Sequence, residues 1–283
     1  MSISLLLSKQ NADGGWPYVH GKSWTEPTAY AVMALLDARE SAAAQRGVAW
    51  LRRVVRPDGG WPPQAGVDES TWVTALVALL PPQILGNPAY ERAIGWLTST
   101  SGRETSSIYR MRQWLLGNSR PPDQEHPGWP WVPGAAAWVG PTSIAMMALD
   151  KAERQSPSPA VRGRLEEGRQ FLLTRMCQGG GWNHGSARPL GYDSRPYPET
   201  TGMALAALRG AKSQNMDSAV ATAQRFLAES RSADALNWLQ LGLLAQHRLP
   251  QDWAMPSGVA TRTLSETALG LLVAAAKEGR NAF

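Results

Sequence analysis

Gly-Trp turns recur along the chain, and each one precedes an apolar segment that opens with Thr or Ser. Gly15-Trp16-Pro17 is followed by Pro27-Thr28, and Gly128-Trp129-Pro130 is followed by Pro141-Thr142. The Trp and the Thr are 12 residues apart in the first copy and 13 in the second. Weaker copies begin at Gly60-Trp61, Gly181-Trp182 and Trp253. Such a repeat indicates stacked helical units, none of which buries its apolar face alone.

Two kinds of helix alternate in this plan. The first kind is rich in Ala, Leu and Met and apolar nearly all round, which is typical of buried helices. We call these the inner helices, and they open at Thr28, Ser70-Thr71, Thr142, Thr200-Thr201 and Thr267. The outer helices are polar on one side, carry an aromatic–Leu pair, and are expected over 45–55, 90–100, 165–177 and 219–230. The sequence therefore predicts an all-α ring of about six helix pairs, an α/α toroid.

The repeats run through the whole chain without a linker, so we expect one domain over residues 1–283. Ser156-Pro157-Ser158-Pro159 suggests a seam near 154–160 between two related halves. The 125 residues between Thr142 and Thr267 support such a duplication. A helix over 104–116 has the pattern of an outer helix but directly follows another outer helix, so its place in the ring is left open.

Charge and composition limit the partners. There are 28 Lys and Arg against 23 Asp and Glu, a net charge of +5, and the basic residues form no block, so no nucleic-acid partner is expected. The mild positive charge suits an anionic small molecule or a peripheral membrane contact. The single cysteine, Cys177, excludes a disulfide within the chain, and no signal peptide is recognised. We expect a cytoplasmic protein that associates with membranes at most at their surface.

An outer helix followed by its turn forms a recognisable unit. Arg46-Gly47-Val48-Ala49-Trp50-Leu51 is followed by Gly59-Gly60-Trp61, and Leu5-Leu6 and Gln10 precede Gly14-Gly15-Trp16. This unit resembles the Gln-Trp repeat of squalene–hopene cyclases, in the terpene cyclase and prenyltransferase α/α-toroid family. The copies are degenerate, because Val55 and Met176 occupy two of the Gln positions. The resemblance covers nearly the whole chain and implies the fold more strongly than any one activity.

The resemblance also implies an acid. Class II terpene cyclases protonate an alkene with the middle Asp of an Asp-x-Asp-Asp motif at the start of an inner helix. In the nearest segment here, Asp68 falls at the protonating position and Glu69 at the last acid, while Gly66 replaces the first. A second segment matches the Asp-x-Asp-Asp motif only at its last acid, which is Glu199. We predict Asp68, Glu69 and Glu199 as catalytic residues.

These acids have a second interpretation that stays open. Like Glu26 and Glu266, they fall at predicted helix starts, where carboxylates cap free N–H groups and offset the helix dipole.

Protein prenyltransferases of this fold bind zinc through Asp, Cys and His. Here Arg175, not an acid, lies two residues before Cys177, and the four histidines have no ligand-like spacing. We predict no metal and no cofactor.

Aromatic residues and one long loop are the candidate substrate contacts. Trp24, Trp72 and Trp138 fall near inner-helix starts, where they would face a carbocation or simply fill the core. The loop over 184–197 is long and polar, as functional loops are, or it is a solvated connection. Its candidates are Arg188, Tyr192, Asp193, Arg195 and Tyr197, with the two arginines placed to bind an anionic head group.

The leading hypothesis is an isoprenoid-handling enzyme. It would cyclise or transfer a prenyl or triterpene chain by acid-initiated carbocation chemistry, and its ligand would be a small hydrophobic molecule or a prenyl diphosphate. The alternative is a non-catalytic α/α-toroid binding or scaffold module that has lost the acid motif.

Overall fold

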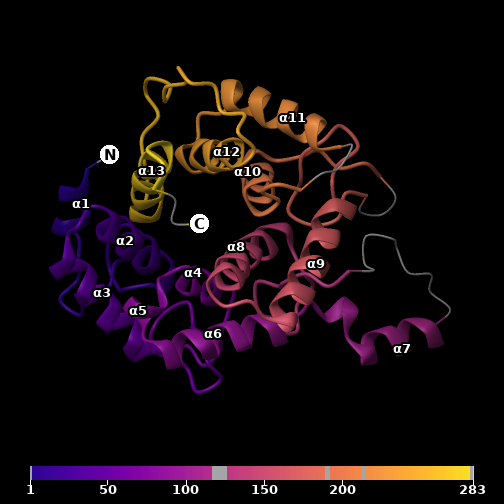
Figure 1. Ribbon diagram of the computed structural model, residues 1–283, viewed down its shortest axis with the longest axis horizontal. Coiled ribbons are helices and arrows are strands. Elements are labelled where there is room, and N and C mark those ends of the chain that lie inside the picture. The colour runs from indigo at the N-terminus through magenta and orange to yellow at the C-terminus, as the bar shows by residue number, and fades with distance from the viewer. Residues whose placement is uncertain (1, 117–125, 189–191, 212–214, 281–282) are drawn as a thin grey trace. The chain divides into compact units, whose positions relative to one another are not determined.

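The computed structural model describes residues 2–116, 126–188, 192–211, 215–280 and 283, and Figure 1 shows its helices in order. These are α1 (Ile3–Ser8), α2 (Thr25–Asp37), α3 (Ser41–Val54), α4 (Val73–Ala78), α5 (Pro82–Leu85), α6 (Asn87–Ser99), the 3-10 helix η1 (Arg103–Thr105), α7 (Ser107–Leu115), α8 (Val139–Gln155), α9 (Pro159–Thr174), α10 (Pro198–Ala207), α11 (Met216–Glu229), α12 (Ala233–Ala245) and α13 (Leu264–Lys277). Over this part of the chain there are isolated bridges but no strand, so the all-α prediction is confirmed.

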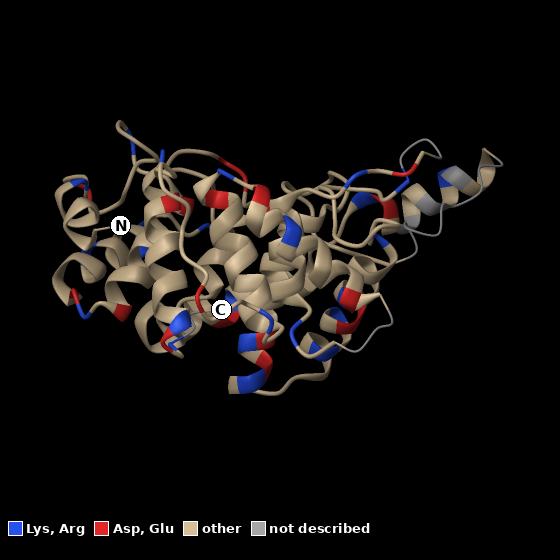
Figure 2. Cartoon of the chain, turned by 90° about the horizontal axis from the view of Figure 1, so that it is seen from above, with Lys and Arg blue, Asp and Glu red and all other residues tan. Residues whose placement is uncertain are grey.

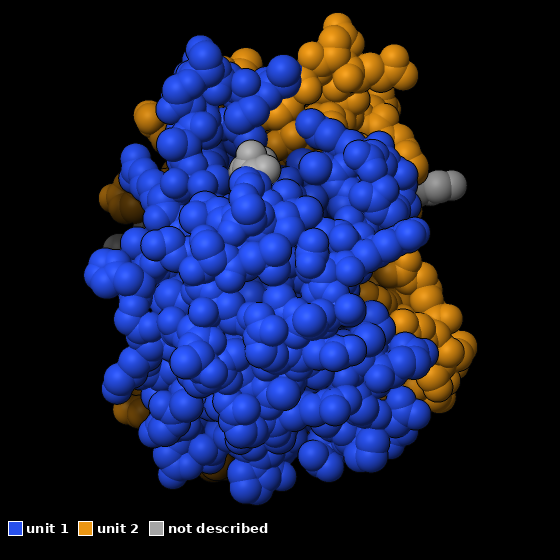
Figure 3. Space-filling view, turned by 90° about the vertical axis from the view of Figure 1, so that its left-hand side faces the viewer, with its two compact units in different colours: residues 1–97, 231–237, 254–283 blue, residues 98–230, 238–253 orange. Residues whose placement is uncertain are grey.

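The chain divides into two compact units, which Figure 3 colours separately. Unit 1 comprises residues 1–97, 231–237 and 254–283, and unit 2 comprises 98–230 and 238–253. In unit 1, α2 packs against α3, α4 and α13; in unit 2, α8 packs against α9 and α10. The single domain over 1–283 stays a prediction, and the expected seam near 154–160 lies inside unit 2.

The two kinds of helix differ in burial as expected. In α2, ten of the 13 side chains are buried, Thr25 and the run from Pro27 to Leu35, and α8 is buried continuously from Val139 to Leu149. The outer helix α3 is buried only on the side that carries Trp50 and Leu51. The predicted helix starts are wrong: α2, α8, α10 and α13 begin three residues before Thr28, Thr142, Thr201 and Thr267, and α4 begins after Ser70-Thr71. The Ser70 hydroxyl donates to Asp58 at 2.7 Å instead of capping the helix, and α4 begins at Val73.

Four of the repeat Trp residues share one arrangement, whereas the Trp253 N–H donates within its own turn, to the Pro250 carbonyl at 3.2 Å. In the shared arrangement the Trp joins neighbouring helices through hydrogen bonds. Its backbone N–H donates to a Thr hydroxyl in the next inner helix, in the pairs Trp16–Thr28, Trp61–Thr74, Trp129–Thr142 and Trp182–Thr201 at 2.8–3.1 Å. Its indole N–H donates to a carbonyl ten residues earlier, in the pairs Trp16–Leu6, Trp61–Leu51 and Trp182–Leu172. These buried indoles explain why the chain repeats Trp and not another large apolar residue.

The glycine two residues before the Trp is required by the backbone. Gly14 has φ +94°, and a Cβ built there would lie 2.6 Å from the Arg46 carbonyl oxygen. Gly59 and Gly180 repeat this conformation with φ +88° and +86°. An L side chain would be strained by the dihedral and would also collide with the neighbouring outer helix.

Thr142→Val should destabilise the protein by about 1–3 kcal/mol, because it leaves the buried Trp129 N–H without its acceptor. Thr142→Ser keeps the hydroxyl and is the matched control, with a smaller expected loss. Urea unfolding of both variants measures the difference. Equal losses would show that the hydrogen bond is not what Thr142 contributes.

The helix expected over 104–116 differs from the prediction. Glu104 lies in η1, where its buried carboxylate accepts the Ala137 N–H at 3.0 Å, and Ser106 caps a shorter helix, α7. Its large apolar side chains are exposed, so α7 does not pack as an outer helix; they are Ile108, Met111, Trp114, Leu115 and, just beyond it, Leu116. α7 projects from the rest of unit 2 in Figures 1 and 2.

Charges are interspersed over the described helices and loops in Figure 2, as the sequence indicates. No helix in the described ranges is long and apolar enough to cross a membrane.

Candidate functional site

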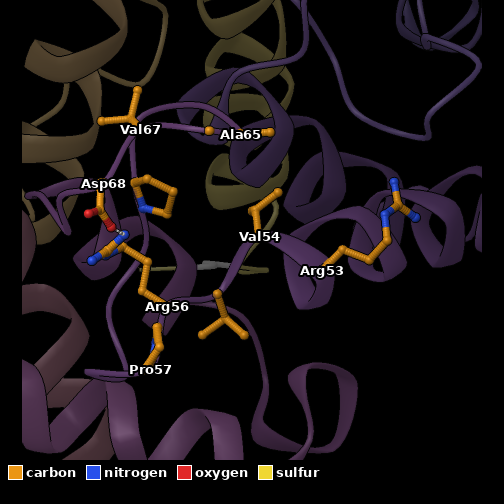
Figure 4. A pocket seen from close by; sticks show the side chains of 10 residues that line it. Arg53, Val54, Arg56, Pro57, Ala65, Val67 and Asp68 are labelled. Carbon is orange, nitrogen blue, oxygen red and sulfur yellow. Dashed lines mark hydrogen bonds and ion pairs between the residues drawn. The ribbon is translucent and has the colours of Figure 1, made fainter.

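Asp68 lies at the rim of an open pocket in unit 1, shown in Figure 4. Its carboxylate is 2.5 Å from Arg56 Nη1, and its side chain is 95% exposed. The pocket has a volume of about 450 Å³. Its lining residues are Arg53, Val54, Val55, Arg56, Pro57, Pro62, Ala65, Gly66, Val67 and Asp68.

Asp68 and Glu69 are not at a helix start, contrary to the expectation. They lie in the loop before α4, and Glu69 is exposed as well. Nothing desolvates the Asp68 carboxylate, which forms an exposed ion pair with Arg56. The catalytic role of both acids stays a prediction, and their surroundings are those of a solvated loop.

A different acid in unit 1 lies among aromatic rings. Glu26 is in the first turn of α2, and Tyr18 Oη donates to its Oε2 at 2.5 Å. The Tyr18 and Trp24 rings are 5.5 Å apart between centroids. We call Tyr18, Trp24 and Glu26, with the buried Tyr30 of α2, the acid–aromatic cluster.

Burial controls the protonation of this cluster. It raises the pKa of Glu26 above 4.5, and the Tyr18 hydrogen bond offsets part of that rise by stabilising the carboxylate. Burial and the Glu26 charge also raise the pKa of Tyr18 and of Tyr30, so both phenols keep their protons. The result is a carboxyl group that stays protonated to higher pH than an exposed Glu.

Unit 2 carries the counterpart of this arrangement. Tyr18 and His184 each lie two residues after a repeat Trp, and Glu26 and Glu199 each lie two residues before the Thr that this Trp contacts. His184 Nε2 is 3.5 Å from Glu199 Oε1, and its ring is 4.8 Å from that of Tyr197. Here the pair is more open, since the side chains of His184 and Glu199 are 44% and 29% exposed.

The aromatic candidates fall at helix starts as expected. Trp24, Trp72 and Trp138 are the N-cap residues of α2, α4 and α8. Trp138 lies beside the His184–Gly185 segment, whose His184 carbonyl accepts the Val139 N–H at 2.9 Å. Trp138, Tyr197 and Glu199 therefore belong to one region of unit 2, whereas Trp24 and Trp72 belong to unit 1.

The remaining loop candidates are exposed. Arg188 pairs with Asp193 at 3.0 Å, and Tyr192 is 78% exposed. Arg195 is also exposed. Residues 189–191 of this loop lie outside the described residues. The substrate-binding role of these residues stays a prediction.

Tyr18 and His184 become site candidates only in the structure, and the sequence marks Glu26 only as a helix-capping acid. The sequence feature that could have identified them is their position, because Tyr18 and His184 each lie two residues after a repeat Trp.

Metal ligands do not gather in the part of the chain that the structure describes: no three His, Cys, Asp or Glu side chains lie close enough to hold an ion. Cys177 is buried, and burial raises the pKa of its thiol.

Comparisons with known proteins give the fold and one sequence relative. No protein-family profile matches the chain. Squalene–hopene cyclase of Zymomonas mobilis is 27% identical over 124 residues, which cover 36% of this chain and only 18% of that enzyme. The type II terpene cyclase MstE from Scytonema, solved with geranylgeranyl dihydroxybenzoate, has a TM-score of 0.53 at 16% identity and matches 98% of this chain and 76% of its own.

Glucanases share the fold as well. The endo-β-1,4-glucanase CMCax from Acetobacter xylinum has a TM-score of 0.61 at 14% identity, over 98% of this chain and 97% of its own. A GH8 endo-β-1,4-glucanase from an Achatina fulica gut metagenomic library has a TM-score of 0.60 at 15% identity. At such identities the likeness concerns the fold alone. The chain has an α/α-toroid fold of the kind shared by terpene cyclases and GH8 glucanases.

Proposed function

We propose that this protein is an isoprenoid-handling enzyme of the terpene-cyclase type in which Glu26, not Asp68, is the acid. The observation that carries the proposal is the half-buried Glu26 carboxyl group, which accepts the Tyr18 hydrogen bond beside the Trp24 ring. The sequence relative that directs it to isoprenoids is squalene–hopene cyclase.

The chemistry of alkene protonation favours Glu26 over Asp68. The donor must hold its proton until the substrate arrives, and burial does this for Glu26. When the proton leaves, the Tyr18 hydroxyl is already placed to stabilise the carboxylate. The cation that forms must meet aromatic faces such as Trp24, because water would capture it. The Asp68 side chain is 95% exposed, so water would reach a cation formed beside it.

The Gln-Trp assignment supports the same family. Gln10 Nε2 donates to the Ala43 carbonyl in α3 at 2.9 Å, so it joins neighbouring helices as a repeat Gln would. The indole of Trp16 holds the helix that precedes it.

A second candidate function is glycoside hydrolysis. The observation that favours it is the fuller match to the glucanases, with TM-scores of 0.60–0.61 against 0.53 for the cyclase. A general acid with a raised pKa also suits protonation of a glycosidic oxygen.

One assay separates these candidates. The purified protein is incubated in parallel with squalene, with geranylgeranyl diphosphate and with carboxymethylcellulose. Cyclised or transferred prenyl products support the proposal, and new reducing ends support the glucanase alternative. If no substrate turns over, the enzyme proposal fails and the non-catalytic binding module is favoured.

We also propose a peripheral membrane contact through α7. Its apolar side chains are 58–77% exposed, and Arg103 before the helix and Arg112 within it are exposed as well, which suits the anionic surface of a bilayer.

The double variant Trp114→Ser, Leu115→Ser should lose at least about tenfold in binding to anionic phospholipid vesicles, because two large apolar side chains no longer enter the bilayer. Vesicle sedimentation measures this. The control Tyr192→Ser removes an equally exposed aromatic outside α7 and should bind normally. Failure of the wild type to sediment with anionic vesicles would refute the contact.

A further inference from the structure

The pocket beside Asp68 combines apolar walls with a cation. Val54, Val55, Pro62 and Val67 line it, and the Arg56 guanidinium lies at its rim. Figure 4 shows Arg56 directed at Asp68, whereas Arg53 extends away from both. Arg53 Nη2 donates to the Asp13 carbonyl instead. Arg56 is therefore the cation that this pocket offers to a ligand.

The Asp68–Arg56 ion pair shows how a carboxylate binds in this pocket. Asp68 Oδ1 contacts Arg56 Nη1 at 2.5 Å, while Arg56 is only 24% exposed. Such a pair contributes little to stability, since its Asp68 side chain is 95% exposed and water competes for that carboxylate. Asp68 can therefore leave Arg56 at little cost when another anion arrives.

Arg56 also has unused hydrogen-bonding capacity. Its Nε is buried and has no hydrogen-bond partner. A guanidinium binds a carboxylate best when two N–H groups engage two oxygens. The observed contact with Asp68 uses Nη1 alone.

We infer that this pocket binds an apolar chain that ends in a carboxylate, and that Asp68 is the internal competitor for the ligand's head group. The chain lies against the valines and prolines, and the head group replaces Asp68 on Arg56. A volume of about 450 Å³ falls in the range of small-molecule sites. Asp68 thus regulates binding, and it is not required to donate a proton.

This site is independent of the proposed catalytic acid. It shares no residue with the acid–aromatic cluster, so Glu26→Gln should leave decanoate binding unchanged while lowering any turnover by about 10²- to 10⁴-fold. Failure of one proposal is therefore distinguishable from failure of the other.

The test is calorimetric titration of the full chain with decanoate and with uncharged decan-1-ol. Arg56→Gln should weaken decanoate binding at least about tenfold, because the charge-assisted contact is lost. Asp68→Asn should tighten it about three- to tenfold, since the competing carboxylate is gone. Arg92→Gln, an exposed arginine of α6 outside the pocket, is the matched control and should bind as the wild type does.

The two pocket variants are expected to act in opposite directions, which a general loss of folding cannot imitate. Circular dichroism confirms that each variant is folded before titration. The inference is overturned if decanoate does not bind, if decan-1-ol binds as tightly, if Asp68→Asn fails to tighten binding, or if Arg56→Gln leaves it unchanged.

Discussion

Glu26→Gln should lower turnover of the isoprenoid substrate by about 10²- to 10⁴-fold, the usual contribution of a general acid. Gln fills nearly the same space and accepts the Tyr18 hydrogen bond, but it has no proton to donate. Substrate binding should change little, so the loss falls on kcat. Product formation measured over a range of substrate concentrations separates the two parameters.

The pH profile gives this prediction a direction. Burial raises the pKa of Glu26, so its active, protonated form persists above pH 4.5 and is lost as the pH rises through the raised pKa. The free energy of unfolding changes in the same direction. The folded state holds this proton more tightly than the unfolded state does, so the contribution of Glu26 to stability falls as the pH rises from 4.5 through the raised pKa. Glu26→Gln should remove both effects.

Two controls locate the effect. Tyr18→Phe removes the hydrogen bond that lowers the pKa of Glu26, so the alkaline limb of the profile should move to higher pH. Glu69→Gln changes an exposed loop acid and should leave turnover intact. Loss of activity in Glu69→Gln with full activity in Glu26→Gln would return the assignment to the Asp68–Glu69 segment.

Trp182→Ala should destabilise the protein by about 3–5 kcal/mol, the cost of removing a large aromatic side chain from a packed core. Trp182 is fully buried, and its indole N–H donates to the Leu172 carbonyl at 2.7 Å. The variant therefore creates a cavity and also removes one of the two N–H donors of the Leu172 carbonyl, which keeps the Arg175 N–H at 3.2 Å. Denaturant unfolding followed by circular dichroism measures the loss.

The chain offers a matched control for this effect. Trp114 is in the same unit but is 77% exposed, so Trp114→Ala should change stability by no more than about 0.5 kcal/mol. Similar losses in both variants would show that the repeat Trp does not have the structural role assigned to it.

The fold was largely predictable because its signal is local and repeated. Helices α2 and α8 follow from Ala- and Leu-rich segments that carry Thr28 and Thr142 in their first turns, and the Trp–Thr spacing corresponds to a hydrogen bond that holds each turn on the next helix. α7 was less predictable, because its apolar pattern is that of a packed helix although Ile108, Met111, Trp114 and Leu115 are exposed.

The roles of the acids were harder to predict, because the local sequence does not determine how deeply a carboxyl group is buried or what it contacts. Aligning Ser70-Thr71 with an inner-helix start placed Asp68 at a helix N-terminus, yet it is Thr74 that accepts the Trp61 N–H. Glu26 has the sequence of an ordinary capping acid. Its partner Tyr18 lies eight residues earlier and meets it only through the fold of the turn.

The central claim is that Glu26 delivers a proton to carbon, and isotope incorporation tests this most directly. The reaction is run in D₂O with wild type and with Glu26→Gln, and products are analysed by mass spectrometry. The proposal predicts a cyclised product one mass unit heavier from the wild type and none from the variant. Product without deuterium, or labelled product formed equally by Glu26→Gln, would contradict it.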